Sequence, residues 1–598
     1  MPKDTKKITP INYLSKEFVD IRSDLIQLAQ RYYPDQFQDF SESSFGAMMV
    51  DAVAYVGDQL SLYLDYNVNE SFLDTAFETA NIVRHGRILG YKDLGRPSTY
   101  GRVALYIMVP AEIVGLGPDA RYIPQLKRGS SFGSDTGLNY ILTENVDFNN
   151  PANDFVAARV DESTGTPTHY AIKAYGNVVS GQLGVKKLTI GAYEKFKRVK
   201  LGPANIVEII SVFDTEGNEY FEVDYLAQDM IYKELENKNF QNDNVPSILK
   251  PMLVSRKFVV ERSGNDVILQ FGSGEEGESN VIANPQNVAM EIFGKTYVTD
   301  TTFDPTRISK NSNFGIVPSN TQLIVSYRST NPQNSNAATR AINKVNGTNF
   351  QFADPNAIVR SSMEAVITSL EVSNETPIVG NVSMPSSGEI KRRIFDTFPT
   401  QNRAVTQADY ENLAYRMPAK FGSIKRVSCQ KDQDSLKRNL NMYVISEDSS
   451  GKLTQTNSTI KNNLKTWLSN YRMINDTVDI LDPYIINLGI EFVIKTPAGT
   501  DKNAALESAY KTLKEKFSEG FFIAEQLYIS DVYSELKKDP RILDVVKVKI
   551  VNKTGATYSP AAFNVNKNIS PDGSYLMAPQ NAVFEIKFPD VDIKGKVR

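Results

Sequence analysis

The first hydrophobic pattern along the chain predicts a helix over residues 13–33. Its apolar side chains recur at alternating spacings of four and three, as in the seam of a coiled coil or helical bundle. We expect Pro34 to end this helix, and the serines of SESS (41–44) to cap a second helix that runs to about Asn69. The seam consists of Leu14, Phe18, Ile21, Leu25, Leu28 and Tyr32.

The second helix carries more apolar surface than one core can use. Its broad apolar face consists of Phe45, Met48, Met49, Ala52, Val53, Val56, Leu60 and Leu64. A neighbouring column of small residues, which permits close helix approach, consists of Ala47, Val50, Ala54, Gly57 and Ser61, and Tyr55, Leu62 and Tyr66 add apolar surface beyond both. A third helix is predicted over 72–89, ending at Gly90. Either the three helices pack only on one another, or at least one face is kept for another chain.

The pattern changes between Pro97 and about Pro377. Short runs of β-branched and aromatic residues, such as RVALYIMV, VEIISVFD, DVILQF and TQLIVSYR, are separated by Gly, Asn, Asp and Pro. These runs predict a mostly antiparallel β region with more than one subdomain.

Helices and strands alternate from about residue 378. The segment 387–398 is amphipathic, and Thr406 and Asp409 stand at the two positions of a capping box. The long apolar segments 484–495 and 542–551 read as strands. This order predicts α/β sandwiches of the split βαβ kind. One side of the 387–398 helix would carry Ile390, Ile394, Phe395 and Phe398, and further helices are expected near 456–471, 501–517 and 529–538.

The predicted fold class is therefore multidomain α+β. An N-terminal helical bundle arm would occupy residues 1–95, a β-rich middle region 96–377, and a C-terminal α/β region of sandwich-like domains, used for self-association, 378–598. A length of 598 residues fits several domains, because single cores rarely grow beyond about 250 to 300 residues.

Composition narrows the possible partners. Hydrophobic residues make up 41% and charged residues 23%, close to globular averages, so wholesale disorder is not expected. The net charge of -4 gives no basic footprint, so we expect no nucleic acid partner. The single Cys429 cannot form an intramolecular disulfide, so the chain can fold in cytoplasm. The longest apolar run, 103–111, is about half of a membrane span, so we expect neither secretion nor membrane insertion.

Two glycine motifs resemble phosphate-binding loops, and neither is expected to function as one. FGSGEEG (271–277) contains G-x-G-x-x-G after a predicted strand, but its glutamates would repel an anion and the following sequence does not predict a helix. GKT (294–296) lacks the upstream glycine of a P-loop, since residue 289 is Ala. FGSGEEG is interpreted as a turn.

Other candidate chemistry is sparse. Asp51, Asp58 and Asp65 repeat every seven residues, about 10.5 Å apart along a helix, which is too far for two of them to share a metal ion. They are interpreted as a polar stripe that is solvated or meets basic residues. The chain has only two histidines, His85 and His169, and one cysteine. These residues supply few ligands for a transition-metal site and a single candidate for a thiol nucleophile. We predict no enzyme activity, no cofactor and no metal site.

Several stretches together resemble one protein family. They are DFSESSFGAMMVDAVAYVGDQLSLYLDYNVNESFLDTAFETANIVRHGRILGY (39–91), EYFEVDYLAQDM (219–230) followed by FGSGEEG, and NRAVTQADYENLA (402–414). The chain resembles the baseplate wedge proteins of contractile-tailed bacteriophages, the baseplate J-like family. Its length and FGIVPSNTQL (314–323) are most similar to the inner-ring wedge subunit of large myoviruses. Residues 100–375 depart most from the pattern.

The resemblance implies a structural protein of the virion tail baseplate, assembled in the host cytoplasm. It implies that two copies join a smaller wedge protein in a heterotrimer through an N-terminal helical bundle, while C-terminal parts link copies into a ring around the tail tube. Sheath-initiating and other wedge proteins would be further partners. The surplus faces of the helices would then pack against a partner. The residues expected there are Leu14, Phe18, Ile21, Leu25, Ala47, Val50, Ala54, Gly57, Ser61, Tyr55 and Leu62.

The expected action is mechanical, joining wedges and rearranging to trigger sheath contraction. The main alternative is a tail-associated cell-wall (glycan) hydrolase, which would require a convergent pair of carboxylates in a cleft. A receptor-binding fibre would require sequence repeats, and none is found in the chain.

Overall fold

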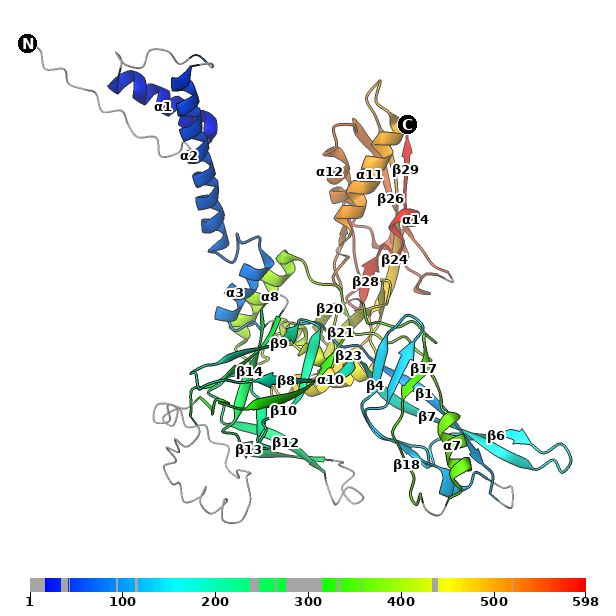
Figure 1. The fold of residues 1–598 in the computed structure, drawn as a ribbon. Helices are drawn as coiled ribbons and strands as arrows, with labels where there is room; N and C mark the ends of the chain where they lie inside the picture. The colour runs from blue at the N-terminus through cyan, green and yellow to red at the C-terminus, as the bar shows by residue number, and fades with distance from the viewer. Residues whose placement is uncertain are drawn as a thin grey trace, which may run out of the picture. The chain divides into compact units, whose positions relative to one another are not determined.

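The computed structural model describes residues 17–33, 41, 44–92, 95–112, 117–236, 247–263, 266–275, 314–330, 334–355, 358–432, 439–518, 520–555 and 557–598 (Figure 1). The chain divides into two compact units, Met1–Lys92 with Pro385–Pro399, and Asp93–Met384 with Thr400–Arg598. The predicted fold class is confirmed, with a helical N-terminal region, a β-rich middle and C-terminal α/β content.

The first unit is helical. Its helices are α1 (Phe18–Tyr32), α2 (Phe45–Glu70), α3 (Thr79–Ile88) and most of α8 (Ser387–Thr400). The first two predicted helices are confirmed, although Leu14 and Pro34 lie outside the described residues. The prediction for the third helix is wrong at its start, because residues 71–78 form a turn and an extended segment before Thr79. Gly90 follows α3 with a φ of +88°, the left-handed conformation expected of a glycine that ends a helix.

The second unit begins with a seven-stranded sheet. Its strands follow one another across the sheet in the order β17 (Ile342–Gly347), β3 (Ser131–Ser134), β4 (Asn139–Leu142), β7 (Pro167–Ser180), β1 (Tyr100–Pro110) and β19 (Glu371–Ser373). The seventh strand, β6 (Asp154–Val160), also pairs with β7. Helix α7 (Arg360–Thr368) packs on β1, and Val366 joins the core of this sheet. Smaller elements beside it are η1 (Ala120–Tyr122), β2 (Gln125–Leu126), β5 (Val146–Asp147) and β18 (Phe350–Gln351).

A second seven-stranded sheet follows with its own core. Its order is β8 (Gln182–Thr189), β16 (Gln322–Ser329), β10 (Ile206–Phe213), β11 (Glu219–Glu222), β14 (Lys257–Ser263), β15 (Asp266–Phe271) and β9 (Arg198–Pro203). The pair β12 (Met230–Glu236) and β13 (Ser247–Leu253) forms a separate two-stranded sheet. Apart from the parallel pair β11 and β14, these described strands pair antiparallel, as predicted.

The C-terminal part alternates helices and strands, as predicted. Helix α9 (Gln407–Tyr415) begins with the predicted capping box, in which Thr406 and Asp409 each accept the other's backbone N–H. Strands β21 and β23 run parallel on either side of α10 in the chain, which is a βαβ connection. The elements of this part are η2 (Ala419–Phe421), β20 (Arg426–Lys431), β21 (Asn439–Glu447), β22 (Leu453–Gln455), α10 (Ser458–Ser469) and β23 (Thr477–Leu481).

The last sheet is built around one long central strand, β24 (Tyr484–Lys495). It pairs antiparallel with β26 (Asp544–Asn552), and parallel on its other edge with β28 (Ala582–Glu585) and β29 (Ile593–Val597). Figure 1 shows α11 (Lys502–Lys516) and α12 (Ile529–Lys537) together on one side of this sheet. Short elements complete it, namely β25 (Leu527–Tyr528), α13 (Val565–Asn568), β27 (Tyr575–Leu576) and α14 (Pro589–Asp592).

The glycine motif after β15 packs against backbone. The N–H of Gly274 donates to Gly315 O at 2.9 Å, and a Cβ on Gly272 would come within 2.3 Å of Phe314 O. The glycines of this stretch therefore allow its backbone to come close to the backbone at Phe314 and Gly315. The end of the motif and residues 294–296 lie outside the described residues.

Candidate assembly surface

Helix α2 is long because its sequence favours helix throughout and its start is capped. Ser44 Oγ accepts the N–H of Ala47 at 3.1 Å, which satisfies one of the free donors at the helix start. The helix runs for 26 residues without proline. The side chains it buries are those of Ala47, Ala54 and Glu70. A helix this apolar therefore gains little of its stability from burial within the described part of the chain.

The column of small residues faces α1 of the same chain. A Cβ on Gly57 would lie 3.3 Å from Ile21 Cδ1, so the absence of a side chain lets the two helices come close. Arg22 Nε donates to Asp51 Oδ1 at 2.5 Å on the same side of α2. Ala54, which is fully buried, stands between these two contacts along the helix. Asp51 of the predicted polar stripe thus meets a basic residue of its own chain.

We expect the double variant Ala54→Leu, Gly57→Leu to separate α1 from α2. Overpacking typically costs about 1 to 3 kcal/mol per site, and neither position has room for an isobutyl group. Hydrogen exchange should show loss of protection in α1 with the second unit unchanged, and assembly with partner proteins should fail. Val56→Leu, at a side chain that is 55% exposed, is the matched control and should alter neither. If α1 kept wild-type protection in the double variant, the contact between α1 and α2 would tolerate larger side chains at these two positions.

Much of the remaining α2 circumference carries large apolar side chains that are exposed. Its large side chains are between 44% and 73% exposed, which is unusual for a helix that carries them on so many sides. We call this set the α2 apolar face. It consists of Phe45, Met48, Met49, Val53, Tyr55, Val56, Leu60, Leu62, Tyr63, Leu64, Tyr66 and Val68. Exposed apolar surfaces of this extent mark sites of protein association.

A buried carboxylate fixes the turn between α2 and α3. Glu70 Oε1 accepts the N–H of Phe77 at 2.8 Å and that of Glu78 at 3.2 Å, and Oε2 accepts Asn81 Nδ2 at 2.8 Å. His85 Nε2 lies 2.8 Å from Glu70 O, so the carbonyl of the same residue is also engaged. These bonds hold the backbone away from helical geometry before Thr79, which explains the late start of α3. The hydrogen bond from Asn81 and that from Phe77 lower the pKa of Glu70, against the opposing effect of burial.

Acid should loosen this turn. Because the folded pKa of Glu70 is lowered, its contribution to stability is fully present above the ordinary glutamate pKa of about 4.3 and is lost as pH falls through the lower folded value. Hydrogen exchange of the Phe77 and Glu78 amides should therefore accelerate in that acidic range. Glu70→Gln keeps an acceptor and should remove the pH dependence, whereas Glu70→Ala should expose both amides at every pH. An unchanged acid response in Glu70→Gln would assign it to another group.

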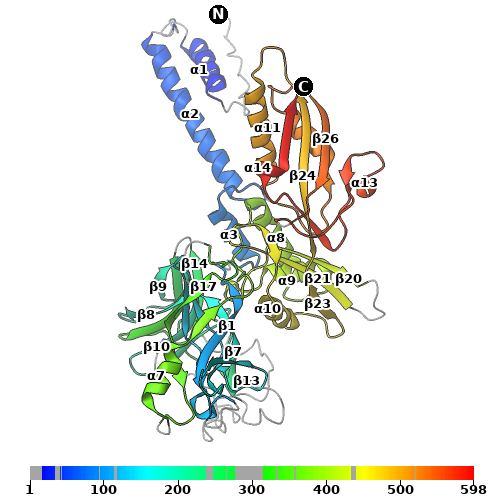
Figure 2. The same ribbon diagram turned by 90° about the vertical axis from the view of Figure 1, so that its right-hand side faces the viewer.

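Helix α8 completes a small core with α3, and Figures 1 and 2 both show the two helices side by side. Ile390 and Ile394 are buried against Ile82, and a Cβ on Gly86 would come within 2.8 Å of Ile394 Cδ1. Lys391 Nζ also donates to the carbonyl of Asp74 at 2.7 Å. The sequence analysis places Phe395 and Phe398 on one side of this helix with the isoleucines, but the two phenylalanines are not buried with them. They are 70% and 61% exposed, whereas Ile390, Ile394 and Thr397 of the same helix are buried.

The structure places the predicted interface residues on α1 and α2 in different surroundings. One group faces or adjoins the contact of α1 with α2 and comprises Ile21, Ala47, Ala54 and Gly57. Tyr55 and Leu62 belong to the α2 apolar face, Phe18, Leu25, Val50 and Ser61 lie on the same two helices, and Leu14 is outside the described residues. Their contact with a partner stays a prediction. Sequence reasoning missed the exposed Phe72 and Phe77, which flank the turn and would have read as core within a predicted helix.

The described residues offer little catalytic chemistry. Burial, with a smaller effect of Glu411, raises the pKa of the Cys429 thiol to about 12, which keeps it protonated. No group of three or more His, Cys, Asp or Glu side chains suited to a metal ion occurs in the described ranges. Within those ranges, too, no helix combines the length and the apolar character needed to cross a bilayer.

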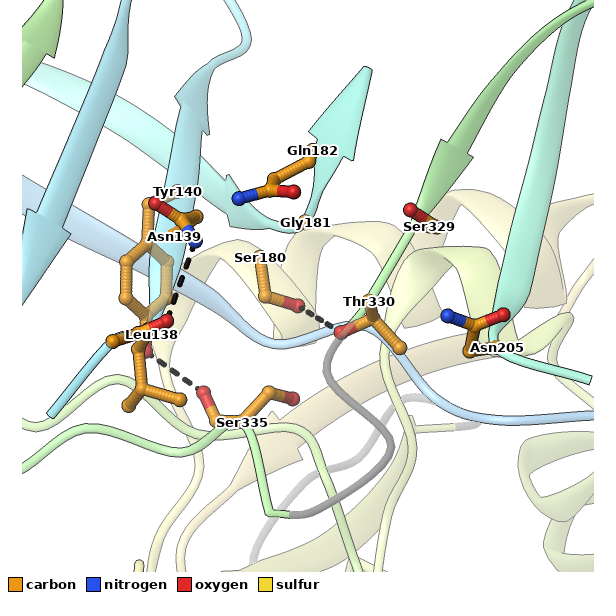
Figure 3. Close-up of a pocket in the computed structure, with 11 residues that line it drawn as sticks. Leu138, Asn139, Tyr140, Ser180, Gly181, Gln182, Asn205, Ser329, Thr330 and Ser335 are labelled. Atoms are coloured by element: carbon orange, nitrogen blue, oxygen red, sulfur yellow. Dashed lines mark hydrogen bonds between the residues drawn. The ribbon is translucent and has the colours of Figure 1, made fainter. Parts of the chain in front are cut away.

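A pocket of about 220 Å³ lies where the first two large sheets meet (Figure 3). Ser180 Oγ and Thr330 Oγ1 are 3.4 Å apart in it, and Tyr140 Oη donates to Ser335 O at 2.8 Å. Ser335 is 2% exposed, and its Oγ has no hydrogen-bond partner among the described residues. A polar pocket of this size suits ordered water. Its described lining is uncharged: Gly137, Leu138, Asn139, Tyr140, Ser180, Gly181, Gln182, Asn205, Ser329, Thr330 and Ser335.

A long helix with large apolar side chains around most of its circumference is typical of a subunit that becomes buried in a larger assembly. Residues 18–88, from the first residue of α1 to the last of α3, match the model of a family described as "Bacteriophage baseplate protein, N-terminal domain". This match supports a baseplate protein.

Similarity to other proteins is weak outside this segment. No curated protein sequence matches the chain. A chain in the cryo-EM structure of the anti-feeding prophage baseplate is similar over 94% of this chain and 89% of its own, with 10% identity and a TM-score of 0.24. A chain of the type VI secretion system TssK-TssF-TssG baseplate subcomplex is similar over 73% of this chain and 95% of its own, with 9% identity and a TM-score of 0.24. TM-scores this low do not establish a shared fold.

Proposed function

We propose that the chain is a structural, non-enzymatic subunit of a phage tail baseplate wedge, assembled in the host cytoplasm and carried in the virion. It would join wedges into a ring around the tail tube and rearrange to trigger sheath contraction. The observation that carries this proposal is the α2 apolar face, because it lies within the segment that matches the baseplate N-terminal domain. The proposed partners are a second copy of the chain, a smaller wedge protein in a heterotrimer, and sheath-initiating and other wedge proteins.

Burial of the α2 apolar face is the energetic basis of the proposed heterotrimer. Fully burying a large apolar side chain contributes about 1.5 to 3 kcal/mol, and α2 presents many of them at about half exposure or more. Helices from a second copy and from the smaller partner would remove this surface from water. The paired α1 would remain on the opposite side, because the small-residue column is already in contact with it.

Self-association is assigned to residues 378–598 as a second part of the proposal. Among the described strands, β26 pairs only with β24, so one edge of it is unpaired. Unpaired edges of this kind are either protected or used to extend a sheet into a neighbour. A two-fold contact between identical copies is the commonest arrangement.

The experiment is to co-express the chain with the proteins encoded beside it and to measure the mass of the purified complex. We expect two copies of the chain with one smaller protein. Recovery of a lone monomer would contradict the proposal, and so would glycan hydrolysis by the purified chain that is lost on changing one carboxylate. If copies of the chain associate through residues 378–598, lysines introduced on α2 should leave the chain dimeric in light scattering.

A further inference from the structure

The sheet formed by β26, β24 and β29 has two unlike faces. Ile490, Phe492 and Ile494 of the central strand point to one face and are at most 1% exposed. Helices α11 and α12 cover that face, with Tyr510 of α11 edge-to-face against Phe492 at 5.7 Å. Gly595 of β29 allows this packing, since a Cβ there would come within 2.4 Å of the Phe492 ring. Alternate residues of the three strands must therefore point away from the helices.

Those outward positions are mostly lysines, and the strand register places them together. Glu491 stands opposite Lys549 of β26 and Lys594 of β29. Val493 stands opposite Lys547 and Lys596 in the next row. Residues paired across neighbouring strands share one face of a sheet, so these rows form a single surface. Figure 2 shows the three strands side by side in the order β29, β24, β26.

A further row extends this surface. Lys495 stands opposite Asp544, and Asp544 already has an ion pair with Lys537 at 3.1 Å. We call the set of Lys495, Lys547, Lys549, Lys594 and Lys596 the lysine face. All five are exposed, and in the described part of the chain none of them has an ion pair. The whole chain has a net charge of -4, so the positive charge of this surface is opposite in sign to that of the chain as a whole.

We propose that the lysine face is a docking surface for an acidic surface of another protein. The argument is charge complementarity, because unpaired lysines lie about 7 Å apart along each outer strand and about 10 Å apart across the central one. A partner that presents carboxylates at comparable spacing would meet several lysines at once. Partly desolvated pairs formed in this way contribute to association rate and to specificity as well as to affinity.

The chemistry of the surface favours protein over other anions. A small anion would meet only one or two of these lysines on an open, flat sheet. A nucleic acid backbone is repelled at the middle of the surface by Glu491, and the outward positions of these rows offer no aromatic ring on which a base could stack. A protein surface can place a basic group opposite Glu491 and carboxylates around it.

Solubility alone does not account for the pattern. Exposed sheet faces remain soluble with both signs of charge interspersed, and that arrangement avoids repulsion between neighbours. Here lysine recurs at alternate positions on both outer strands, so each lysine has another of like sign two residues away. Glu491 offsets part of this repulsion, and an acidic partner that docks would relieve the rest.

The test uses the full chain and two labelled probes, a 20-residue polyglutamate peptide and a DNA duplex of about 20 base pairs, with binding followed by fluorescence anisotropy. We expect the peptide to bind more tightly than the duplex, and more weakly as salt is raised. The variant Lys547→Gln, Lys549→Gln, Lys594→Gln, Lys596→Gln should bind the peptide at least about tenfold more weakly, with unchanged hydrogen exchange in β24. Glu491→Lys should bind it more tightly.

The matched control removes the same number of charges from exposed lysines elsewhere in the second unit, Lys431, Lys465, Lys502 and Lys567. It should keep peptide affinity within about twofold of wild type. Equal losses in the two variants would overturn the proposal, because the peptide would then respond only to total charge. Tighter binding of the duplex, lost in the first variant alone, would also overturn it and identify a nucleic acid surface.

Discussion

A chain carrying Tyr55→Lys and Leu62→Lys is expected to fold like wild type and to fail to assemble. Both side chains belong to the α2 apolar face and are 59% and 62% exposed, and lysine is a good helix former. Exposed substitutions usually change the free energy of unfolding by no more than about 0.5 kcal/mol. At an interface the same residues would be buried, and a charge left in an apolar contact is strongly unfavourable.

The expected loss of assembly is large. Anchor residues of interfaces typically contribute about 2 kcal/mol or more each, so two of them would weaken the complex by roughly 1,000-fold. Native mass measurement of the co-expressed proteins should then show the chain without the smaller partner. Tyr225→Lys with Leu183→Lys, at side chains that are 57% and 58% exposed in the second unit and outside residues 378–598, is the control and should assemble normally. Normal assembly of the α2 variant would remove this face from the interface.

The second large effect is expected from Ile394→Ala. Ile394 is fully buried against α3, where Gly86 has no side chain that could fill the vacated space. Replacing a buried isoleucine by alanine typically costs about 2 to 5 kcal/mol. A chain of several domains does not unfold in one step, so the local measurement is hydrogen exchange of α3 and α8. Those amides should exchange at least about 30-fold faster than in wild type.

The neighbouring residue provides the control for this variant. Phe395→Ala removes a larger side chain from the same helix, but that side chain is 70% exposed. Its exchange rates should stay close to wild type. If both variants lost protection equally, α8 would be sensitive to any change of sequence. The loss of protection in Ile394→Ala would then not be due to the packing of Ile394.

Local signals in the sequence predicted much of this fold. The start of α2 follows from one hydroxyl at Ser44, and the start of α9 from Thr406 and Asp409, and both caps form as expected. Short runs of β-branched and aromatic residues, separated by turn residues, predicted the antiparallel sheets of the middle region.

Features that depend on distant contacts were not predictable in this way. The turn before α3 requires Glu70 to reach the amides of Phe77 and Glu78, and nothing in the local pattern shows that this carboxylate is buried. The exposure of Phe395 depends on which side of α8 meets α3. The apolar side chains of this helix allow more than one of its sides to be the buried one. The lysine face became visible only once the register of three strands was known.

The packing of α8 on α3 has a consequence for synthesis on the ribosome. Ile390 is translated about 300 residues after α3, and elongation at about 5 to 20 residues per second makes that interval roughly 15 to 60 s. During this time the nascent N-terminal helices lack the isoleucines that complete their core, while the apolar side chains of α2 are already outside the exit tunnel. The chain therefore presents a binding segment for a holding chaperone during about half of its own translation.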